Sequence, residues 1–406
     1  GMSAITTSLL TFLQSGDHLL VHQTLYGGTA DYVKHDLPKY GIEFDFIDAM
    51  NPSEWNAKLK SNTKVIYVET ITNPLIEVAP LDKVAAFAKE HGLISMIDNT
   101  FASPALFCPI QLGFDISLHS ATKFLNGHTD IVAGAIIGNE PHMTNINSKL
   151  NHLGGCLDPN ACFLLHRGMK TLSLRIKRQC SNAMKIATFL NNHEMVSHVN
   201  YPGLESDPSH KQAKELLCGL GGMFSFIVKG GVENADKVMS KLKIPMCTAS
   251  MGGVETLITR PVLTSHSLLS DEELLESGID KALIRLAVGI ESATDLINDL
   301  DQNLGFSARQ MSDSKYHLRN GGDYYPDNAS LWRLALYLQE NLTEEQKERL
   351  LSPPDDLNPQ AFSEENDHHH KRLRHHQRMD EYIRTILTAE QESEYDEMID
   401  HKTVVM

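Results

Sequence analysis

Residues 65–98 read VIYVETITNPLIEVAPLDKVAAFAKEHGLISMID, and this stretch decides which fold we expect. Val65–Glu69 and Ile94–Ile97 are short apolar runs, and the helical pattern Asp82–Glu90 lies between them. A strand, a helix and a second strand in this order are typical of two parallel strands joined by a crossover helix. The stretch therefore predicts an α/β fold.

The same alternation of strands and helices extends over residues 5–140. Further short apolar strands are expected at Leu19–His22, Ile116–His119 and Val132–Ile137. Strands that alternate with helices favour a mostly parallel sheet with helices packed on it. In such folds, ligands bind at the carboxyl ends of the strands.

Polar residues stand at the carboxyl ends of four of the expected strands. Tyr26 follows the first strand, Asn73 the second, Asp98 ends the third, and Ser120 to Lys123 follow the fourth. Each residue alone is typical of a turn or a helix cap. Because they occupy equivalent positions in the topology, together they indicate a shared site.

The run Ser-Ala-Thr-Lys-Phe-Leu-Asn-Gly-His at 120–128 indicates the chemistry of that site. A lysine whose amine is kept unprotonated by burial or by a nearby charge can form a Schiff base with an aldehyde cofactor. The hydroxyls of Ser120 and Thr122 stand beside Lys123 and suit a phosphate group. Most lysines are solvated surface charges, so the motif by itself does not decide between a Schiff-base lysine and a surface lysine.

Composition narrows the class of protein. A chain of 406 residues suffices for one large domain and one or two smaller ones. The net charge of −16 disfavours binding to nucleic acid or to an anionic membrane. The six cysteines are scattered, with no C-x-x-C pair, which is typical of reduced thiols. With no signal sequence and no apolar run of about 18 residues, we expect a cytoplasmic protein.

Three domains are expected along the chain. Residues 1–165 form the large domain, and one long or bent helix over 157–192 leads out of it. Residues 166–305 form a smaller α+β domain, because strand patterns such as Met223–Val228 are mixed with helical ones. Residues 306–406 are an appended segment of unknown role.

The appended segment is acidic and is predicted to be helical. It holds 12 Lys and Arg against 20 Asp and Glu. Thr343 and Thr388 each precede acidic residues and read as caps of two helices. The histidine-rich run at 367–377 lacks the regular spacing of metal ligands, so we predict no metal site there.

The motifs together resemble one family from residue 1 to about 304. The segments that carry the resemblance are Gly1-Met-Ser-Ala-Ile, Leu25-Tyr-Gly-Gly-Thr29, Glu69-Thr-Ile-Thr-Asn-Pro74, Asp98-Asn-Thr-Phe, Ser120-Ala-Thr-Lys123, Gly127-His-Thr-Asp130, Arg167-Gly-Met-Lys-Thr-Leu172, Ser250-Met-Gly-Gly-Val-Glu-Thr256 and Leu283-Ile-Arg-Leu-Ala-Val-Gly-Ile-Glu291. The family is that of the pyridoxal-phosphate (PLP) enzymes of Cys/Met metabolism, which includes cystathionine γ-synthase, the cystathionine lyases, methionine γ-lyase and the homoserine sulfhydrylases. The resemblance implies the aspartate-aminotransferase type of fold (fold type I) and a homo-oligomer, a dimer or tetramer.

The resemblance also implies roles around the cofactor. Lys123 matches the Schiff-base lysine, which then moves protons between substrate and cofactor. Asp98 matches the carboxylate that pairs with the pyridinium nitrogen. Asn73 matches the side chain beside the phenolic oxygen, and Tyr26 matches the ring that stacks on the pyridine and assists proton transfer. Lys123 and Tyr26 are thus the expected catalytic residues.

The same resemblance implies which residues bind the cofactor's phosphate and which phosphate ligands are missing from this sequence. Ser120 and Thr122 match phosphate ligands, and Gly1 and Met2 match positions whose backbone N–H groups meet the phosphate at a helix start. Family members carry a further N-terminal segment that supplies a Tyr and an Arg to the neighbouring subunit's phosphate. The sequence in hand starts at Gly1, so we expect weakened cofactor binding.

The substrate is expected to be a small amino acid. Arg285 matches the residue that binds the substrate α-carboxylate, and Ser250 lies beside it in the match. Ala249 stands where enzymes acting on cystathionine often have Glu, which favours a smaller or less polar distal group. Gly28 stands where methionine γ-lyases often have Cys. The two positions point to different substrates, and both stay open.

The function expected from the resemblance is a PLP-dependent, trans-sulfuration-type enzyme. It would cleave or form the Cγ–S bond of cystathionine, methionine or a homoserine derivative by elimination or replacement. The alternative is a remnant with impaired cofactor binding that serves as a non-catalytic binding or scaffold module.

Overall fold

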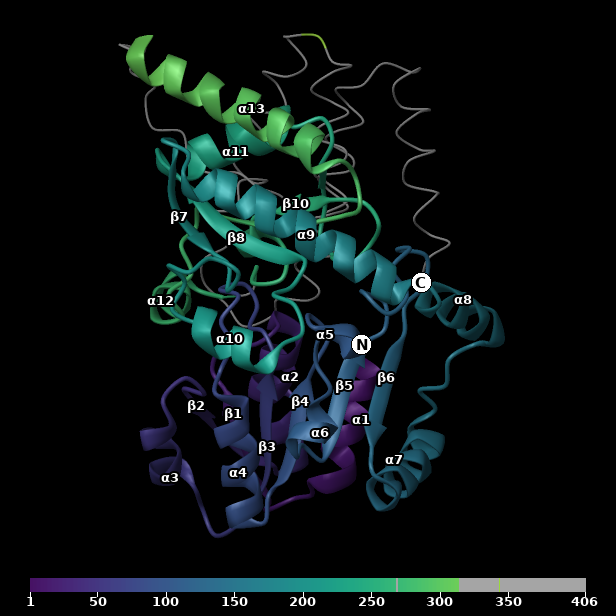
Figure 1. Cartoon of the computed structure of the whole chain (residues 1–406). Coiled ribbons are helices and arrows are strands. Elements are labelled where there is room, and N and C mark those ends of the chain that lie inside the picture. The colour runs from purple at the N-terminus through teal and green to yellow at the C-terminus, as the bar shows by residue number, and fades with distance from the viewer. Residues whose placement is uncertain (268, 314–342, 344–406) are drawn as a thin grey trace. The chain divides into compact units, whose positions relative to one another are not determined.

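The computed structural model describes residues 1–267, 269–313 and 343 (Figure 1). The chain divides into the unit Gly1–Tyr316, to which every element below belongs, and the unit His317–Met406. Apart from Thr343, the part of the expected helical extension beyond Asp313 lies outside the described residues, and so does the histidine-rich run at 367–377.

The first sheet has six strands in the order β2-β1-β3-β4-β5-β6. The strands are β1 (His18–His22), β2 (Glu43–Ile47), β3 (Thr63–Glu69), β4 (Ile94–Asp98), β5 (Ile116–Ser120) and β6 (Gly134–Gly138). Neighbours are parallel except β5 and β6, which are antiparallel. The mostly parallel sheet expected from the sequence is confirmed, and β2 is an edge strand that the sequence analysis did not identify.

Helices cover both faces of this sheet. Those on one face are α1 (Met2–Phe12), α2 (Gly27–His35) and α7 (Glu140–Leu153), and those on the other are α3 (Trp55–Lys58), α4 (Leu81–His91), α5 (Ser103–Leu106) and α6 (Pro109–Leu112). Successive strand residues point to opposite faces. Tyr67 therefore packs with Leu9 of α1, while Ile66 packs with Val84 of α4. Burial on both sides explains the many apolar residues in the central strands of the sheet.

Two helices lead to the second sheet, where one long or bent helix was expected. They are α8 (Pro159–Met169) and α9 (Leu172–Asn191). At the end of α8, Gly168 passes so close to the turn after Lys123 that a Cβ atom there would lie 2.2 Å from the Asn126 carbonyl oxygen. The chain turns at this contact and begins α9 directly afterwards.

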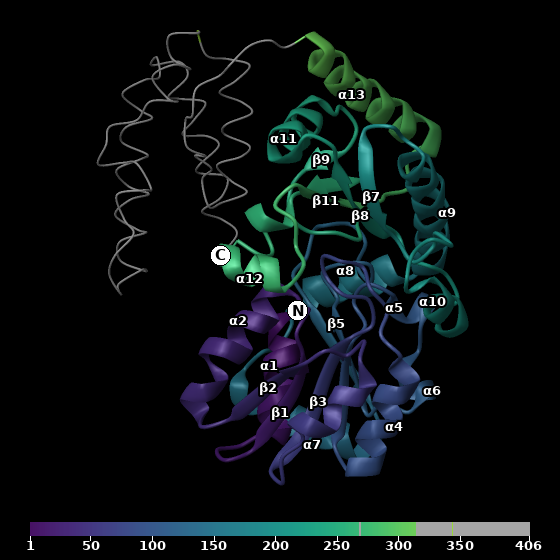
Figure 2. The same ribbon diagram turned by 90° about the vertical axis from the view of Figure 1, so that its left-hand side faces the viewer.

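The second sheet is mixed and has helices packed on one face. Its order is β7-β8-β11-β10-β9, and neighbouring strands are antiparallel except β9 and β10. The elements of this part are β7 (Val196–Asn200), α10 (His210–Leu216), β8 (Met223–Val228), α11 (Gly231–Lys241), β9 (Met246–Cys247), β10 (Leu257–Thr259), α12 (Asp271–Glu276), β11 (Leu283–Ala287) and α13 (Ala293–Asp313). The helices α9, α11 and α13 lie beside this sheet (Figure 2), and their buried side chains share one core with it. The expected boundary after residue 305 falls within α13.

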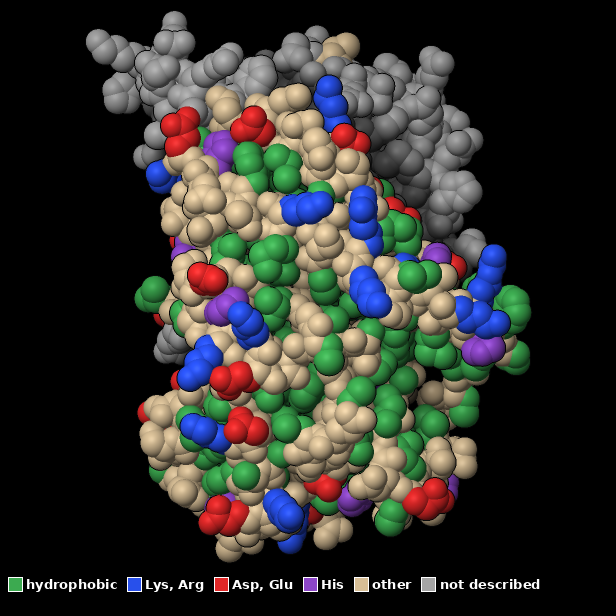
Figure 3. Space-filling view, viewed as in Figure 1, with side chains coloured by type: hydrophobic (Ala, Val, Ile, Leu, Met, Phe, Trp, Pro, Cys, Tyr) green, Lys and Arg blue, Asp and Glu red, His purple; other side chains and the backbone are tan. Residues whose placement is uncertain are grey.

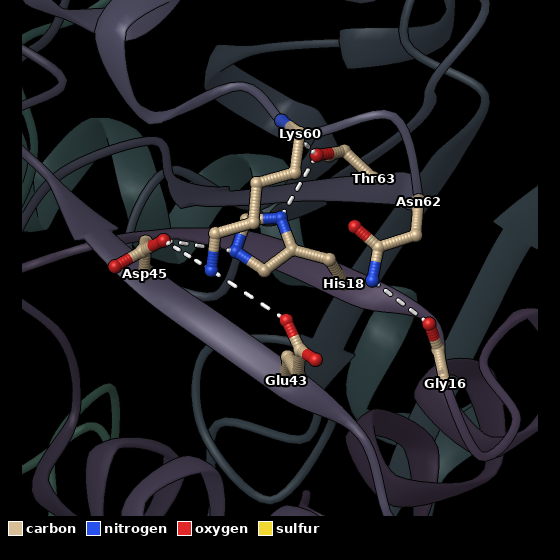
Figure 4. A network of polar contacts seen from close by, with 7 residues as sticks. All are labelled: Gly16, His18, Glu43, Asp45, Lys60, Asn62 and Thr63. Atoms are coloured by element: carbon tan, nitrogen blue, oxygen red, sulfur yellow. Dashed lines mark hydrogen bonds and ion pairs between the residues drawn. The ribbon is translucent and has the colours of Figure 1, made fainter.

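A polar network joins β1, β2 and β3 near the amino ends of β1 and β3 (Figure 4). His18 is buried at the start of β1; its Nδ1 lies 2.8 Å from Thr63 Oγ1 and its Nε2 3.2 Å from Asp45 Oδ2. Lys60 Nζ lies 2.9 Å from the same Asp45 oxygen and 3.6 Å from Glu43. Burial lowers the pKa of His18, so the imidazole links β1, β2 and β3 in its neutral form.

Within the described residues, the helices are all too short or too polar to cross a bilayer.

Candidate active site

Two carboxylates meet at the carboxyl ends of β3 and β4. Glu69 and Asp98 are paired in the parallel register of these strands, so their side chains point to the same face of the sheet, the face covered by α1 and α2. Both are buried. Burial raises the pKa of Asp98, and it raises the pKa of Glu69 well above the ordinary range, with repulsion from Asp98 adding to the effect. The pair is therefore suited to holding a cation or a proton.

Each carboxylate also positions a neighbouring segment. Asp98 Oδ1 accepts a bond from the Thr100 N–H at 2.9 Å and another from the Thr100 hydroxyl. Glu69 Oε1 accepts the Tyr26 N–H at 2.7 Å, which fixes the start of α2. Sequence reasoning assigned no role to Glu69. The available signal was a charged residue at the end of an otherwise apolar strand.

Lys123 lies in the turn after β5, and its amine is partly buried. Nζ donates to Ser250 Oγ at 2.7 Å, across 127 residues of sequence. Burial, and secondly the charge of Arg285, lower the pKa of this amine from 10.5 to about 8. A shift of this size raises the unprotonated fraction at neutral pH about 300-fold. The structure thus gives Lys123 the property that nucleophilic lysines need.

Arg285 is buried in β11 and reaches the same place from the second sheet. Nη1 donates to Asn73 Oδ1 at 2.8 Å and Nη2 to the Ser250 carbonyl at 3.1 Å. Its buried Nε has no hydrogen-bond partner among the residues that the structure describes. Burial lowers the pKa of Arg285 to about 10, against a smaller opposing effect of the Tyr26 hydroxyl. A charged donor left without a partner in a buried site favours an anionic ligand such as a carboxylate.

Tyr26 precedes α2 and is 43% exposed. Its ring lies over Gly28, where a Cβ atom would come within 2.7 Å of the ring carbon Cε1. Glycine at position 28 therefore permits the observed orientation of the ring.

The start of α1 lies beside the end of β5. A Cβ atom on Gly1 would lie 3.0 Å from Ser120 Oγ, so Gly1 and Met2 bring the first turn of α1 next to that hydroxyl. The Thr122 hydroxyl is bonded to the backbone instead: it accepts the Ala133 N–H at 2.9 Å and lies 3.2 Å from the Ala133 carbonyl. A helix start beside a serine hydroxyl is suited to a phosphate group.

The arrangement fits PLP, the cofactor expected from the sequence. Four groups lie along one edge of the sheet: the Lys123 amine of lowered pKa, the buried Asp98 carboxylate, the start of α1 and the Arg285 guanidinium, whose Nε is unpaired within the described residues. Among the residues that the structure describes, no three His, Cys, Asp or Glu side chains are grouped so as to hold a metal ion.

Comparisons with known proteins agree with this geometry. The model of the family "Cys/Met metabolism PLP-dependent enzyme" matches residues 1–305. The chain is 40% identical over 307 residues to an L-methionine γ-lyase of Fusobacterium nucleatum subsp. polymorphum, covering 75% of this chain and 78% of the relative. It is 42% identical over 310 residues to a cystathionine γ-lyase of Bacillus subtilis (strain 168), covering 75% and 80%. A crystal structure of cystathionine γ-lyase from Lactobacillus plantarum, complexed with L-serine, superimposes with a TM-score of 0.73 at 38% identity, covering 76% and 81%.

Proposed function

The chain belongs to the family of Cys/Met metabolism PLP-dependent enzymes, and we propose that within it the protein is a lyase that eliminates the sulfur substituent from Cγ of its amino-acid substrate. It is a PLP-dependent enzyme of the trans-sulfuration type, cleaving or forming the Cγ–S bond of cystathionine, methionine or a homoserine derivative. The comparisons give no support to the alternative of a non-catalytic scaffold.

One observation carries the assignment of the site. The amine of Lys123 is 2.7 Å from Ser250 Oγ, and the Ser250 carbonyl is 3.1 Å from Nη2 of Arg285. A proton acceptor and a carboxylate-binding guanidinium are thus held on either side of the same residue. This spacing is suited to an α-amino acid, whose carboxylate carbon and proton are both bonded to Cα.

The residues around the lysine would hold the cofactor. Bound PLP supplies an aldehyde that condenses with an amine and a ring that takes up the electron pair left at Cα. Asp98 would pair with the protonated ring nitrogen. Ser120 and the first N–H groups of α1 would bind the phosphate, since a helix start favours anions. Asn73 and Tyr26 would contact the ring from neighbouring loops. Thr122, in the turn that holds Lys123, would contribute to the phosphate site.

The chain's own residues then act on the substrate. Arg285 binds the α-carboxylate, and its unpaired Nε becomes satisfied. At neutral pH an appreciable fraction of molecules holds Lys123 Nζ unprotonated. This amine removes the proton from Cα and then a proton from Cβ, while Ser250 Oγ orients it. The Tyr26 hydroxyl would protonate the thiolate that leaves Cγ. With methionine, the balanced products are methanethiol, 2-oxobutanoate and ammonia, with one water consumed.

A second candidate is cleavage at Cβ. The chain is also 42% identical over 299 residues to a cystathionine β-lyase of Lactococcus lactis. Ala249 and Gly28, which differ from the residues common in the two kinds of γ-enzyme, do not separate the candidates. Both reactions begin with removal of the Cα proton, so the same site serves either.

Cystathionine separates the two candidates in one assay. Elimination at Cγ gives cysteine and 2-oxobutanoate, whereas elimination at Cβ gives homocysteine and pyruvate. We expect 2-oxobutanoate from purified, PLP-supplemented protein, and no product from Lys123→Ala. Exclusive formation of pyruvate would replace the γ-lyase by the β-lyase, and replacement products formed only with an added thiol and an O-acylhomoserine would indicate a synthase. Full turnover by Lys123→Ala would remove the lysine from the mechanism.

We also infer that the protein is a homo-oligomer. Apolar side chains are exposed on β6, α8, α9 and the adjoining loops, including Val132 at 78%, Phe163 at 63% and Leu174 at 72%. Figure 3 shows hydrophobic side chains gathered on the surface over β6 and α8. Exposed apolar patches of this kind mark contact surfaces. A second copy of the chain, in a dimer or tetramer, would cover them.

Two coarser expectations stay as proposals. We place the domain boundaries after residues 165 and 305, which assigns the first sheet to the large domain and the second sheet to the small one. We propose a cytoplasmic location, which the six free cysteines support.

A further inference from the structure

The buried face of α9 changes character along its length. Its second half places Ile186 and Leu190 in the core of the second sheet. In its first half the same side of the helix holds Arg175, Gln179 and Asn182, spaced four and three residues apart and 4%, 0% and 1% exposed. These three residues are called the α9 polar stripe below. Buried polar side chains are retained where they make hydrogen bonds, so their partners show what the stripe holds.

Arg175 holds the turn that follows Lys123. Nη1 donates to the Phe124 carbonyl at 2.9 Å and Nη2 to the Gly168 carbonyl at 2.9 Å. Gly127 lets the turn approach, because a Cβ atom there would lie 2.0 Å from Nη1. The guanidinium is therefore enclosed by backbone carbonyls of the turn and of α8.

The other two members of the stripe hold the segments that follow Ser250 and Arg285. Gln179 Nε2 donates to the Gly253 carbonyl at 2.7 Å, whereas its Oε1 meets no hydrogen-bond partner in residues 1–267, 269–313 and 343. Asn182 Nδ2 donates to the carbonyls of Gly289 at 3.1 Å and Glu291 at 2.9 Å. One face of α9 thus forms hydrogen bonds with the backbone that follows Lys123, Ser250 and Arg285, the three residues around the proposed reaction centre.

The segment held by Gln179 lies directly on the lysine. A Cβ atom on Gly252 would lie 2.6 Å from the Phe124 nitrogen, so the loop crosses the Lys123–Phe124 peptide in close contact. Ser250, at the other end of this loop, has a φ of 97°, which is a strained conformation for a non-glycine residue. Such strain persists only where the surroundings hold it. Arg285 holds the loop at the Ser250 carbonyl, and Gln179 holds it at Gly253.

We propose that Gln179 is a positioning residue for Lys123. The hydrogen bond from Gln179 to Gly253 keeps Ser250 Oγ in contact with the lysine amine. The inference rests on the proposed role of Lys123, but the contact that it concerns exists in the chain without cofactor or substrate. Within the described residues, the bond donated to Gly253 is the whole polar function of the amide, because its carbonyl oxygen has no partner there. Loss of that donor frees the loop, so that Ser250 Oγ leaves the lysine amine and water takes its place.

The test measures the lysine itself in cofactor-free protein. Acetylation of Lys123 is followed as a function of pH by mass spectrometry of its peptide, which gives the pKa of this one amine. The unaltered chain should give a pKa of about 8. Gln179→Met keeps the length of the side chain and removes the donor. Because burial is the main cause of the low pKa, we expect the variant to raise it by about one unit and to slow acetylation at pH 8 about fivefold.

Three further proteins make the result decisive. Gln212→Met is the matched control, because the Gln212 amide on α10 reaches only Asp82, 3.5 Å away at the surface, and it should change nothing. Gln179→Asn keeps an amide that is too short to reach Gly253, and it should behave like Gln179→Met even if the latter folds poorly. In a Ser250→Ala background, Gln179→Met should add less than about 0.3 unit, since it acts through Ser250.

Two outcomes would overturn the proposal. One is an unchanged Lys123 pKa in a folded Gln179 variant, with folding checked by the thermal midpoint. The other is a full additional shift in the Ser250→Ala background. Turnover is not part of the measurement, so a failed γ-lyase assay with a shifted pKa would refute the proposed function alone, and an unshifted pKa in an active enzyme would refute this inference alone.

Discussion

Replacement of His119 by Gln should make the protein's stability less sensitive to acid by a calculable amount. His119 lies in β5 with 3% of its surface exposed, and its Nδ1 has no hydrogen-bond partner within the described part of the chain. Burial lowers the pKa of this imidazole from 6.5 to about 4. The unfolded chain therefore binds a proton at a higher pH than the folded chain does. Stability is lost as the pH falls below 6.5, and the loss levels off near pH 4.

The magnitude follows from the two pKa values. Between pH 7.5 and pH 5.5, a site with pKa 6.5 in the unfolded chain and about 4 in the folded chain costs about 1.3 kcal/mol of the free energy of unfolding. The replacement has a constant packing cost at both pH values, which cancels in the difference. His119→Gln should thus lose about 1.3 kcal/mol less than the unaltered chain on this pH change.

Urea unfolding at the two pH values, followed by circular dichroism, measures the difference. His152 is exposed on α7, so His152→Gln is the matched control and should leave the pH dependence unaltered. The buried acids Glu69 and Asp98, whose pKa values are raised, act in the opposite direction in both proteins and cancel. An equal loss of stability in His119→Gln and in the unaltered chain would refute the argument that burial keeps this imidazole neutral.

The remaining predictions concern the site and the surface. Arg285→Lys should raise the KM for the amino-acid substrate at least tenfold in steady-state assays, because a hydrogen bond to a charged group is worth about 1.5–3 kcal/mol; an unchanged KM would place the carboxylate elsewhere. Gly28→Ala should displace the Tyr26 ring and reduce kcat/KM, while the thermal midpoint stays nearly constant because a side chain moves and not the backbone; equal kcat/KM would exclude the ring from the reaction. Phe163→Glu should shift the protein to a smaller mass in light scattering, whereas the same change at exposed Tyr40, on the first sheet's other edge, should not; an unaltered mass would remove α8 from the interface.

Local patterns in the sequence were sufficient for the layers of the fold and for the segments that carry the site. Burial on both faces makes the strands of a parallel sheet apolar, so β1, β3, β4 and β5 stand out from the helices between them. The edge strand β2 did not, although its sequence Glu43-Phe-Asp-Phe-Ile47 alternates polar and apolar residues, because only its last residue is buried and it lacks the apolar run of the central strands. The break between α8 and α9 was also hidden, since its cause is the contact of Gly168 with Asn126, 42 residues earlier in the chain.

Only the tertiary structure decided how the site residues act on one another. Lys123, Ser250 and Arg285 are recognisable one by one in the sequence, yet the 2.7 Å contact between the amine and the serine hydroxyl depends on a strained loop crossing the lysine's own peptide. The pKa of Lys123 is lowered by burial and by the charge of Arg285, and neither is a property of local sequence. Glu69 gained its place beside Asp98 from the register of two strands. Spacing along a chain records which groups are present, whereas burial and distance, which set their charges, arise only when the segments pack.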